Sequence, residues 1–135
     1  MQERLPSYHK LLTSGELYRR VEKAKKHLKE CFLCPHACGV DRTGGSGICR
    51  ASHRPIVASY GPHFGEETPL VGRHGSGTIF FGFCNLRCVY CQNYDLSFWG
   101  AGEPVSSEKL ASMMLKLQDD YRCHNINFVT PTHFV

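Results

Sequence analysis

The chain has 135 residues, eight cysteines and a formal net charge of +4, and this length fits one domain of ordinary size. A charge of +4 is too small to indicate nucleic-acid binding, and the longest apolar run is far short of a membrane span. The N-terminal residues lack the charged-then-apolar layout of a secretory signal, so we expect a cytoplasmic protein with neither nucleic acid nor membrane as partner. In that reducing compartment, clustered thiols are metal ligands more often than disulfides.

The first predicted element is a helix that begins near Ser14, whose hydroxyl is expected to accept hydrogen bonds from free backbone N–H groups. Apolar side chains recur at helical spacing along one face of it: Leu17, Val21, Ala24 and Leu28. The opposite face is basic and carries Arg19, Arg20, Lys23, Lys25, Lys26 and Lys29. We interpret this basic face as a solvent-exposed surface rather than as a binding site for an acidic partner.

The first cysteine cluster lies in residues 31–54 and has four members: Cys31, Cys34, Cys38 and Cys49. Pro35 and the glycines between these cysteines predict an irregular loop that wraps an ion or a cluster. Four thiolates suit zinc and a second iron–sulfur cluster equally well by ligand type, so both interpretations stay open. His36 lies between two of the cysteines, and we interpret it as a surface residue.

The rest of the chain predicts an α/β fold. A short strand is expected at 55–60, then an irregular stretch, then a buried strand at 78–83. After a long connection, Ser106 or Ser107 is expected to cap a helix, and a further strand covers 125–130. The predicted helix carries an apolar stripe of Leu110, Met113, Met114, Leu117 and Tyr121. Strand, helix and strand in this order form a βαβ unit, which implies a parallel sheet with a right-handed crossover.

The second cysteine cluster, Cys84-x3-Cys88-x2-Cys91, begins at the carboxyl end of the predicted buried strand. Iron–sulfur clusters normally take four cysteines, so three thiolates on a cubane cluster leave one iron open to another ligand. Zinc is the rival interpretation and needs a fourth ligand, for which Asp95 and His124 are candidates. A non-catalytic module that binds zinc or an iron–sulfur cluster, for structure or electron transfer, is therefore the alternative to an enzyme.

The segment Cys84-Asn-Leu-Arg-Cys88-Val-Tyr-Cys91 resembles the CxxxCxxC signature of radical S-adenosylmethionine (SAM) enzymes. The resemblance implies that Cys84, Cys88 and Cys91 hold a [4Fe–4S] cluster whose fourth iron is chelated by SAM. It also implies that the reduced cluster cleaves SAM to a 5′-deoxyadenosyl radical, which abstracts hydrogen from a substrate. Tyr90, next to the third cysteine, would by the same resemblance lie near the adenine of SAM.

Further motifs occur in order along the chain, at residues 31–49, 58–67, 91–93 and 125–133. Together they resemble the PflX-type proteins, which are homologues of the pyruvate formate-lyase activating enzymes. This resemblance implies an oxidoreductase that acts on an unidentified protein or small molecule and takes electrons from a reductant such as flavodoxin or ferredoxin. Many radical SAM enzymes carry a Gly-Gly-Glu type motif after the second strand, where this chain has Thr130-Pro131-Thr132. Thr130, Thr132 and His133 are therefore the candidates for holding the SAM amino group.

The motifs divide the chain into an N-terminal helical segment at 1–30, a Cys-rich metal-binding extension at 31–77 and a βαβ portion at 78–135. A complete (β/α)8 barrel needs about 250 residues. We therefore expect the start of a partial radical SAM barrel in a chain that is the N-terminal part of a longer enzyme and lacks much of the SAM pocket. Catalytic residues beyond the cysteine ligands are not identified by any motif.

Overall fold

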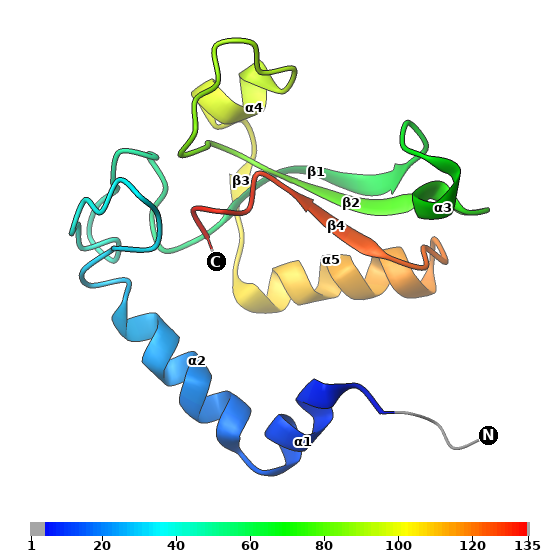
Figure 1. Ribbon diagram of the computed structural model, residues 1–135, viewed down its shortest axis with the longest axis horizontal. Helices are drawn as coiled ribbons and strands as arrows, with labels where there is room; N and C mark the ends of the chain where they lie inside the picture. Colours follow the sequence, from blue (N-terminus) through cyan, green and yellow to red (C-terminus); the bar gives the residue numbers. More distant parts are fainter. Residues whose placement is uncertain (1–4, 135) are drawn as a thin grey trace.

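The computed structural model of the chain describes residues 5–134 and has an α/β fold. Within these residues, one open mixed sheet has the strand order β3-β1-β2-β4, and five helices accompany it (Figure 1). In chain order the elements are α1 (Ser7–Thr13), α2 (Glu16–Lys26), β1 (Ile56–His63), α3 (Thr68–Val71), β2 (Ser76–Phe81), α4 (Tyr94–Trp99), β3 (Glu103–Pro104), α5 (Ser107–Asp119) and β4 (Ile126–Val129). Residues 1–4 of the predicted N-terminal segment and residue 135 of the predicted βαβ portion lie outside the described residues.

The predicted βαβ unit is present as β2, α5 and β4. Residues 77–80 of β2 pair in parallel with residues 126–129 of β4. Ser106 caps α5 as predicted, because its hydroxyl accepts a hydrogen bond from the backbone N–H of Lys109 at 3.2 Å. The sheet has two open edges, so the described residues contain the βαβ unit and no closed barrel.

The stretch predicted to be irregular after the first strand contains the end of β1 and the helix α3, so that part of the prediction was wrong. β1 runs on to His63, α3 follows it, and α4 and β3 lie in the connection after β2. Gly61 and Pro62 weaken the strand pattern in the sequence, yet β1 pairs antiparallel with β2 through both residues. β3 pairs with β1 only at Ile56 and Val57. Among the described strands, Pro62 therefore has a neighbour only on the β2 side, and its lack of a backbone N–H interrupts no pairing on the other side.

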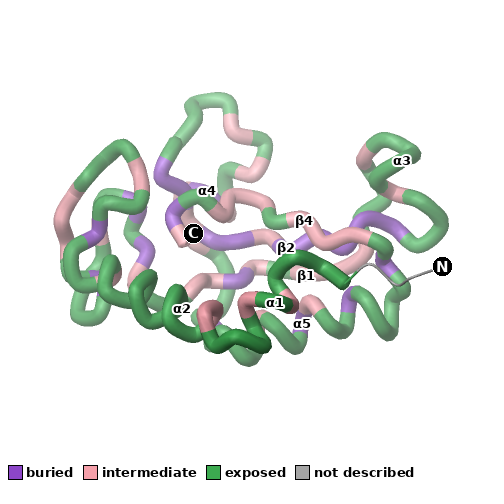
Figure 2. The backbone as a smooth tube through the Cα atoms, turned by 60° about the horizontal axis from the view of Figure 1, so that its bottom comes forward, coloured by how far each residue is buried: buried purple, intermediate pink, exposed green. Residues whose placement is uncertain are grey.

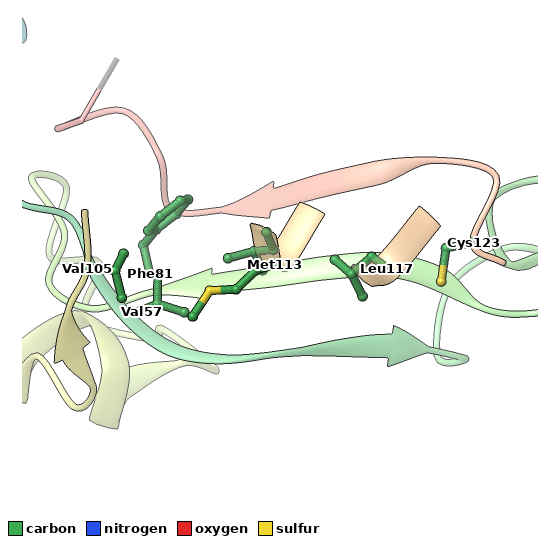
Figure 3. Packing of buried hydrophobic residues seen from close by; sticks show 7 residues of the cluster. Val57, Phe81, Val105, Met113, Leu117 and Cys123 are labelled. Atoms are coloured by element: carbon green, nitrogen blue, oxygen red, sulfur yellow. The ribbon is translucent and has the colours of Figure 1, made fainter. Parts of the chain in front are cut away.

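The hydrophobic core lies between α5 and one face of the sheet (Figure 3). Its buried members are Val57, Ile79, Phe81, Val105, Met113, Leu117 and Cys123. Met113 and Leu117 belong to the stripe predicted on α5, which confirms that the stripe packs in the core. Tyr121, the last member of that stripe, lies beyond the end of α5 and is 42% exposed.

The N-terminal region differs from the prediction of one helix. Gly15, at a φ of 75°, divides it into α1 and α2, and the hydroxyl of Ser14 accepts a hydrogen bond from the N–H of Glu16 at 3.4 Å. Neither helix contains a buried residue, and both are drawn as exposed along most of their length in Figure 2. The apolar face of α2 lines a groove of about 460 Å³ that it shares with α5 and the sheet. In the part of the chain that the structure describes, no helix has the length and apolar character needed to cross a membrane.

Candidate functional site

The loop that carries the second cysteine cluster leaves the sheet at the carboxyl end of β2. Because β2 and β4 are parallel, the segment after β4 leaves the sheet at the same edge. The segment after β4 therefore lies beside the loop that leads to α4. The Cys-rich segment, residues 31–54, lies on the other side of this C-terminal segment (Figure 1). In open α/β sheets, ligands bind at the carboxyl edge of the strands.

The three cysteines of this loop differ in exposure. Cys84 is buried, Cys91 is half-buried and Cys88 is exposed. The sulfur of Cys91 lies 3.3 Å from the hydroxyl of Ser97 on α4. Tyr90, predicted to lie near the adenine of SAM, is 90% exposed. The loop thus keeps one thiol inside the fold and presents another, together with an aromatic ring, at the surface.

Both threonines singled out after β4 contact this loop or the strand that leads into it. The hydroxyl of Thr132 donates a hydrogen bond to Oδ1 of Asn85, the residue after Cys84, at 2.6 Å. The hydroxyl of Thr130 donates to the carbonyl oxygen of Phe81, the last residue of β2, at 3.1 Å. Each hydroxyl oxygen keeps lone pairs that can accept a further hydrogen bond. The structure therefore brings the second cysteine cluster and the residues after β4 together.

The four cysteines of the first cluster line one small cavity. Cys31 and Cys49 are buried, and Cys34 and Cys38 are half-buried. The cavity has about 10 Å³ of free volume, which is room for roughly one water-sized particle. Within residues 5–134, no three or more His, Cys, Asp or Glu side chains are already grouped so that they could hold a metal ion. The four thiols therefore share a cavity without converging on one point.

One local feature leaves room for the sulfur of Cys38, and another favours its thiolate form. Gly47 passes so close that a Cβ built on it would lie 2.8 Å from the sulfur of Cys38, so a side chain at this position would displace the thiol. The backbone N–H of Val40, followed by that of Ile48, lowers the pKa of the Cys38 thiol below its ordinary value. Hydrogen bonds to the ligand atoms are typical of the surroundings of metal sites.

Arg42 is a site residue that the sequence analysis missed. It lines the cavity, is 1% exposed, and lies 3.9 Å through Nη1 from the sulfur of Cys31. Its guanidinium donates hydrogen bonds of 2.6 Å to the carbonyl oxygens of Ser52 and His133. In the described part of the chain it forms no ion pair with a carboxylate. One arginine in a Cys-rich loop is a weak sequence signal, because most arginines are exposed.

His133 connects the same cavity to the sheet. It is 1% exposed, and its Nε2 donates to the carbonyl oxygen of Gly82 at 3.1 Å. Its Nδ1 is buried and has no hydrogen-bond partner among the described residues. Burial lowers the pKa of the His133 imidazole, and the charge of Arg42 acts in the same direction. The neutral ring therefore leaves Nδ1 as an unsatisfied acceptor on a residue that lines the cavity.

The two cysteine segments are attached to each other by side-chain contacts. His36 donates from Nε2 to the carbonyl oxygen of Asn85, beside the first cysteine of the second cluster, at 2.7 Å. Arg50, beside the last cysteine of the first cluster, donates to the carbonyl oxygen of Phe98 on α4 at 3.1 Å. The segment of the first cluster therefore contacts both flanks of the second loop, and the sequence did not predict this proximity.

Of the two candidates for a fourth zinc ligand, Asp95 is exposed on α4, directly after the second cluster, and His124 lies elsewhere. His124 precedes β4, at the amino end of the strand, and its Nε2 is 3.2 Å from the carbonyl oxygen of Pro69. It therefore lies at the opposite end of the strand from the second cluster. Cys123 is buried in the core, and burial raises the pKa of its thiol. Cys123 is therefore a core residue that belongs to neither cysteine cluster.

Two uncharacterized proteins of Methanocaldococcus jannaschii are similar to this chain. The protein MJ0674 is 36% identical over 116 residues, which are 82% of this chain and 33% of the relative. The protein MJ0808 is 23% identical over 120 residues, which are 79% of this chain and 36% of the relative. The chain therefore spans about a third of the length of these relatives. No family model matches the chain, and no solved structure does.

Proposed function

We propose that this chain is a radical SAM iron–sulfur protein that resembles the activating enzymes of glycyl-radical enzymes. The observation that carries the proposal is the position of the three-cysteine loop. It starts just after β2 ends, and the hydrogen bond between Thr132 and Asn85 ties it to the segment after the parallel strand β4. A cofactor held by this loop would lie at the carboxyl edge of two parallel strands, where α/β folds bind their ligands.

The donor set of the loop fits a [4Fe–4S] cluster with one open position. Cys84, Cys88 and Cys91 supply three thiol ligands, and the fourth iron is left for the amino and carboxylate groups of SAM. The sulfur of Cys84 already accepts a hydrogen bond from the N–H of Leu86 at 3.4 Å. When bound, the cluster supplies the electron that cleaves SAM to a 5′-deoxyadenosyl radical. Because Cys88 is exposed, the loop has to close around the cluster.

The residues around the loop suit the two ends of SAM. The hydroxyl oxygens of Thr130 and Thr132 are acceptors for its amino group, because each donates its own hydrogen within the chain. The ring of Tyr90 is free to stack on the adenine, since it is 90% exposed. These three residues act by binding and orientation.

We further infer that β2, α5 and β4 are the first units of a partial (β/α) barrel of the PflX type. Such an enzyme would act on a protein or a small molecule and would receive electrons from a flavodoxin or a ferredoxin. This inference rests on the resemblance of the sequence motifs and on the parallel pairing of β2 with β4.

Anaerobic reconstitution of the chain with iron and sulfide tests the proposal. After reduction, we expect an electron paramagnetic resonance signal of a [4Fe–4S] cluster that changes when SAM is added, together with formation of 5′-deoxyadenosine. Cys88→Ala should abolish both signals, because it removes one of three ligands and Cys88 has no structural role in the core. Cys123→Ala is the matched control, since Cys123 belongs to neither cluster, and it should keep both signals.

A cluster whose spectrum ignores SAM would contradict the proposal and would favour an electron-transfer module. A loop that takes up only zinc would favour a structural metal module instead.

A further inference from the structure

We propose that Cys31, Cys34, Cys38 and Cys49 bind a single zinc ion, and that this ion holds the Cys84–Cys91 loop in position. The zinc site stands on its own observations. The idea that the ion holds the Cys84–Cys91 loop ready for assembly of an iron–sulfur cluster rests on the function proposed above.

The small size of the cavity favours one ion over a cluster. All four cysteines line the cavity, but its free volume of about 10 Å³ admits roughly one water-sized particle. A cubane of four irons and four sulfides is far larger than that volume. A single ion fits after the side chains rotate to bring the sulfurs together, and four thiolates in an enclosed site are a typical structural zinc set.

The charge around the cavity also fits a thiolate site. The guanidinium of Arg42 is 1% exposed and makes contact with the sulfur of Cys31, while its other hydrogen-bond partners are carbonyl oxygens. A buried cation without an anionic partner is strongly destabilising. Four thiolates around Zn²⁺ have a formal charge of about −2, which supplies the missing negative charge next to Arg42.

Two further features mark the cavity as a built site. Gly47 leaves room for the sulfur of Cys38 where any Cβ would lie 2.8 Å from it. The Nδ1 atom of His133, a buried residue that lines the same cavity, is an acceptor without a partner among residues 5–134. A buried unsatisfied group in a native fold calls for an explanation, and a water in the cavity that donates a hydrogen bond to Nδ1 provides one, since four thiolates already complete the coordination of the ion.

The segment that would bind the ion also holds the second loop. His36, between two of the cysteines, donates to Asn85 at 2.7 Å, and Arg50, directly after Cys49, donates to Phe98 at 3.1 Å. Neither contact can persist if residues 31–50 lose their fold. Because residues 31–50 contain no helix and no named strand, a bound ion would add to the stability of their fold.

The metal content of the chain tests the zinc site. The triple variant Cys84→Ala, Cys88→Ala, Cys91→Ala isolates the first cluster, and we expect it to retain about one zinc ion per chain. Cobalt in place of zinc should give intense thiolate-to-metal charge-transfer bands and the visible bands of a tetrahedral ion. Adding Cys49→Ser should remove the ion. Reconstitution of an iron–sulfur cluster in the triple variant, or failure to retain any ion, would overturn the assignment.

Hydrogen–deuterium exchange of residues 84–99 tests the effect on the loop. We expect faster exchange in Cys49→Ser than in the zinc-loaded chain, because the anchors at His36 and Arg50 are lost together. His36→Ala should keep its zinc and still speed exchange near Asn85, whereas His27→Ala, an exposed histidine after α2, should change neither. Equal exchange with and without the ion would overturn the positioning role.

These outcomes are distinguishable from failure of the proposed function. Retained zinc and zinc-dependent exchange, without SAM cleavage, would refute the radical SAM proposal alone. SAM cleavage by a chain whose first cluster holds no zinc would refute the further inference alone.

Discussion

The two cysteine segments use the same side chain in opposite surroundings. In residues 31–49 the four thiols line an enclosed cavity beside a buried arginine. In the loop from Cys84 to Cys91, the middle cysteine is exposed and Tyr90 is 90% exposed. Closed thiolate sites are typical of structural metals, whereas reactive sites keep a position open. Under the two proposals, burial and charge, rather than cysteine spacing, separate the zinc site from the site of the iron–sulfur cluster.

The two segments also differ in what anchors them. The first segment is fixed by Arg42, which bonds to Ser52 and His133. The second loop is held from outside, by His36 of the first segment and by Thr132 after β4. Both segments therefore rely on contacts with the residues after β4, and the second loop relies in addition on His36 of the first segment, so substitutions in the two segments should have unequal reach.

The largest effect is expected for Arg42→Ala. The substitution leaves two carbonyl oxygens without their donor and removes the positive charge beside the thiols. Because hydrogen bonds to charged groups contribute about 1.5–3 kcal/mol each, the free energy of unfolding should fall by about 3 kcal/mol, with loss of bound zinc. Denaturant unfolding and metal analysis measure both. Arg50→Ala is the matched control, since Arg50 is exposed, and should cost less than about 1 kcal/mol. Equal losses in the two variants would contradict the account.

A smaller effect, confined to the first segment, is expected for Gly47→Ala. The new Cβ would lie 2.8 Å from the sulfur of Cys38 and would push it out of the ligand position. Changes around metal ligands typically lower affinity on the order of 10–100-fold, and we expect zinc affinity to fall within that range. Competition with a chelator of known affinity measures the change. Gly44→Ala has no atom within 4 Å of its new Cβ and should bind zinc like the unmodified chain. Similar affinities for the two variants would show that Cys38 does not bind the ion.

The smallest effect is expected for Thr132→Val, which removes the hydrogen bond to Asn85 in the second segment. The free energy of unfolding should fall by about 1 kcal/mol, the net contribution of one hydrogen bond. Zinc content should stay unchanged while the yield of reconstituted cluster falls, and Thr132→Ser should restore it because the hydroxyl is kept. A loss of zinc in Thr132→Val would contradict the account, because it would show that the first segment depends on a contact of the second loop.

Local patterns predicted the parts of the fold that depend on neighbours in sequence. Ser106 and the stripe with Met113 and Leu117 predicted α5, because a cap and a buried helix face are local features. The same periodicity predicted α2 but did not predict which element its apolar face would pack against. Val21 on this face is 43% exposed. Gly15 was not recognised as the break between two helices.

The sequence predicted the candidate site only as two separate cysteine clusters, with no contact between them. The cysteine positions were available from the sequence, but the contact between the two segments depends on tertiary folding. Arg42 and His133 are 91 residues apart in the chain and meet only after β4 is placed beside β2. No spacing rule relates such residues, so the buried guanidinium and the shared cavity were found only in the structure.

The most direct test of the account is the content of zinc, iron and sulfide per chain after anaerobic reconstitution of the zinc-loaded protein. We predict about one zinc, about four irons and about four sulfides, because the enclosed segment takes a single ion and the exposed loop takes a cluster. About eight irons with no zinc would contradict the account, since both segments would then hold clusters, and zinc alone would contradict it at the loop.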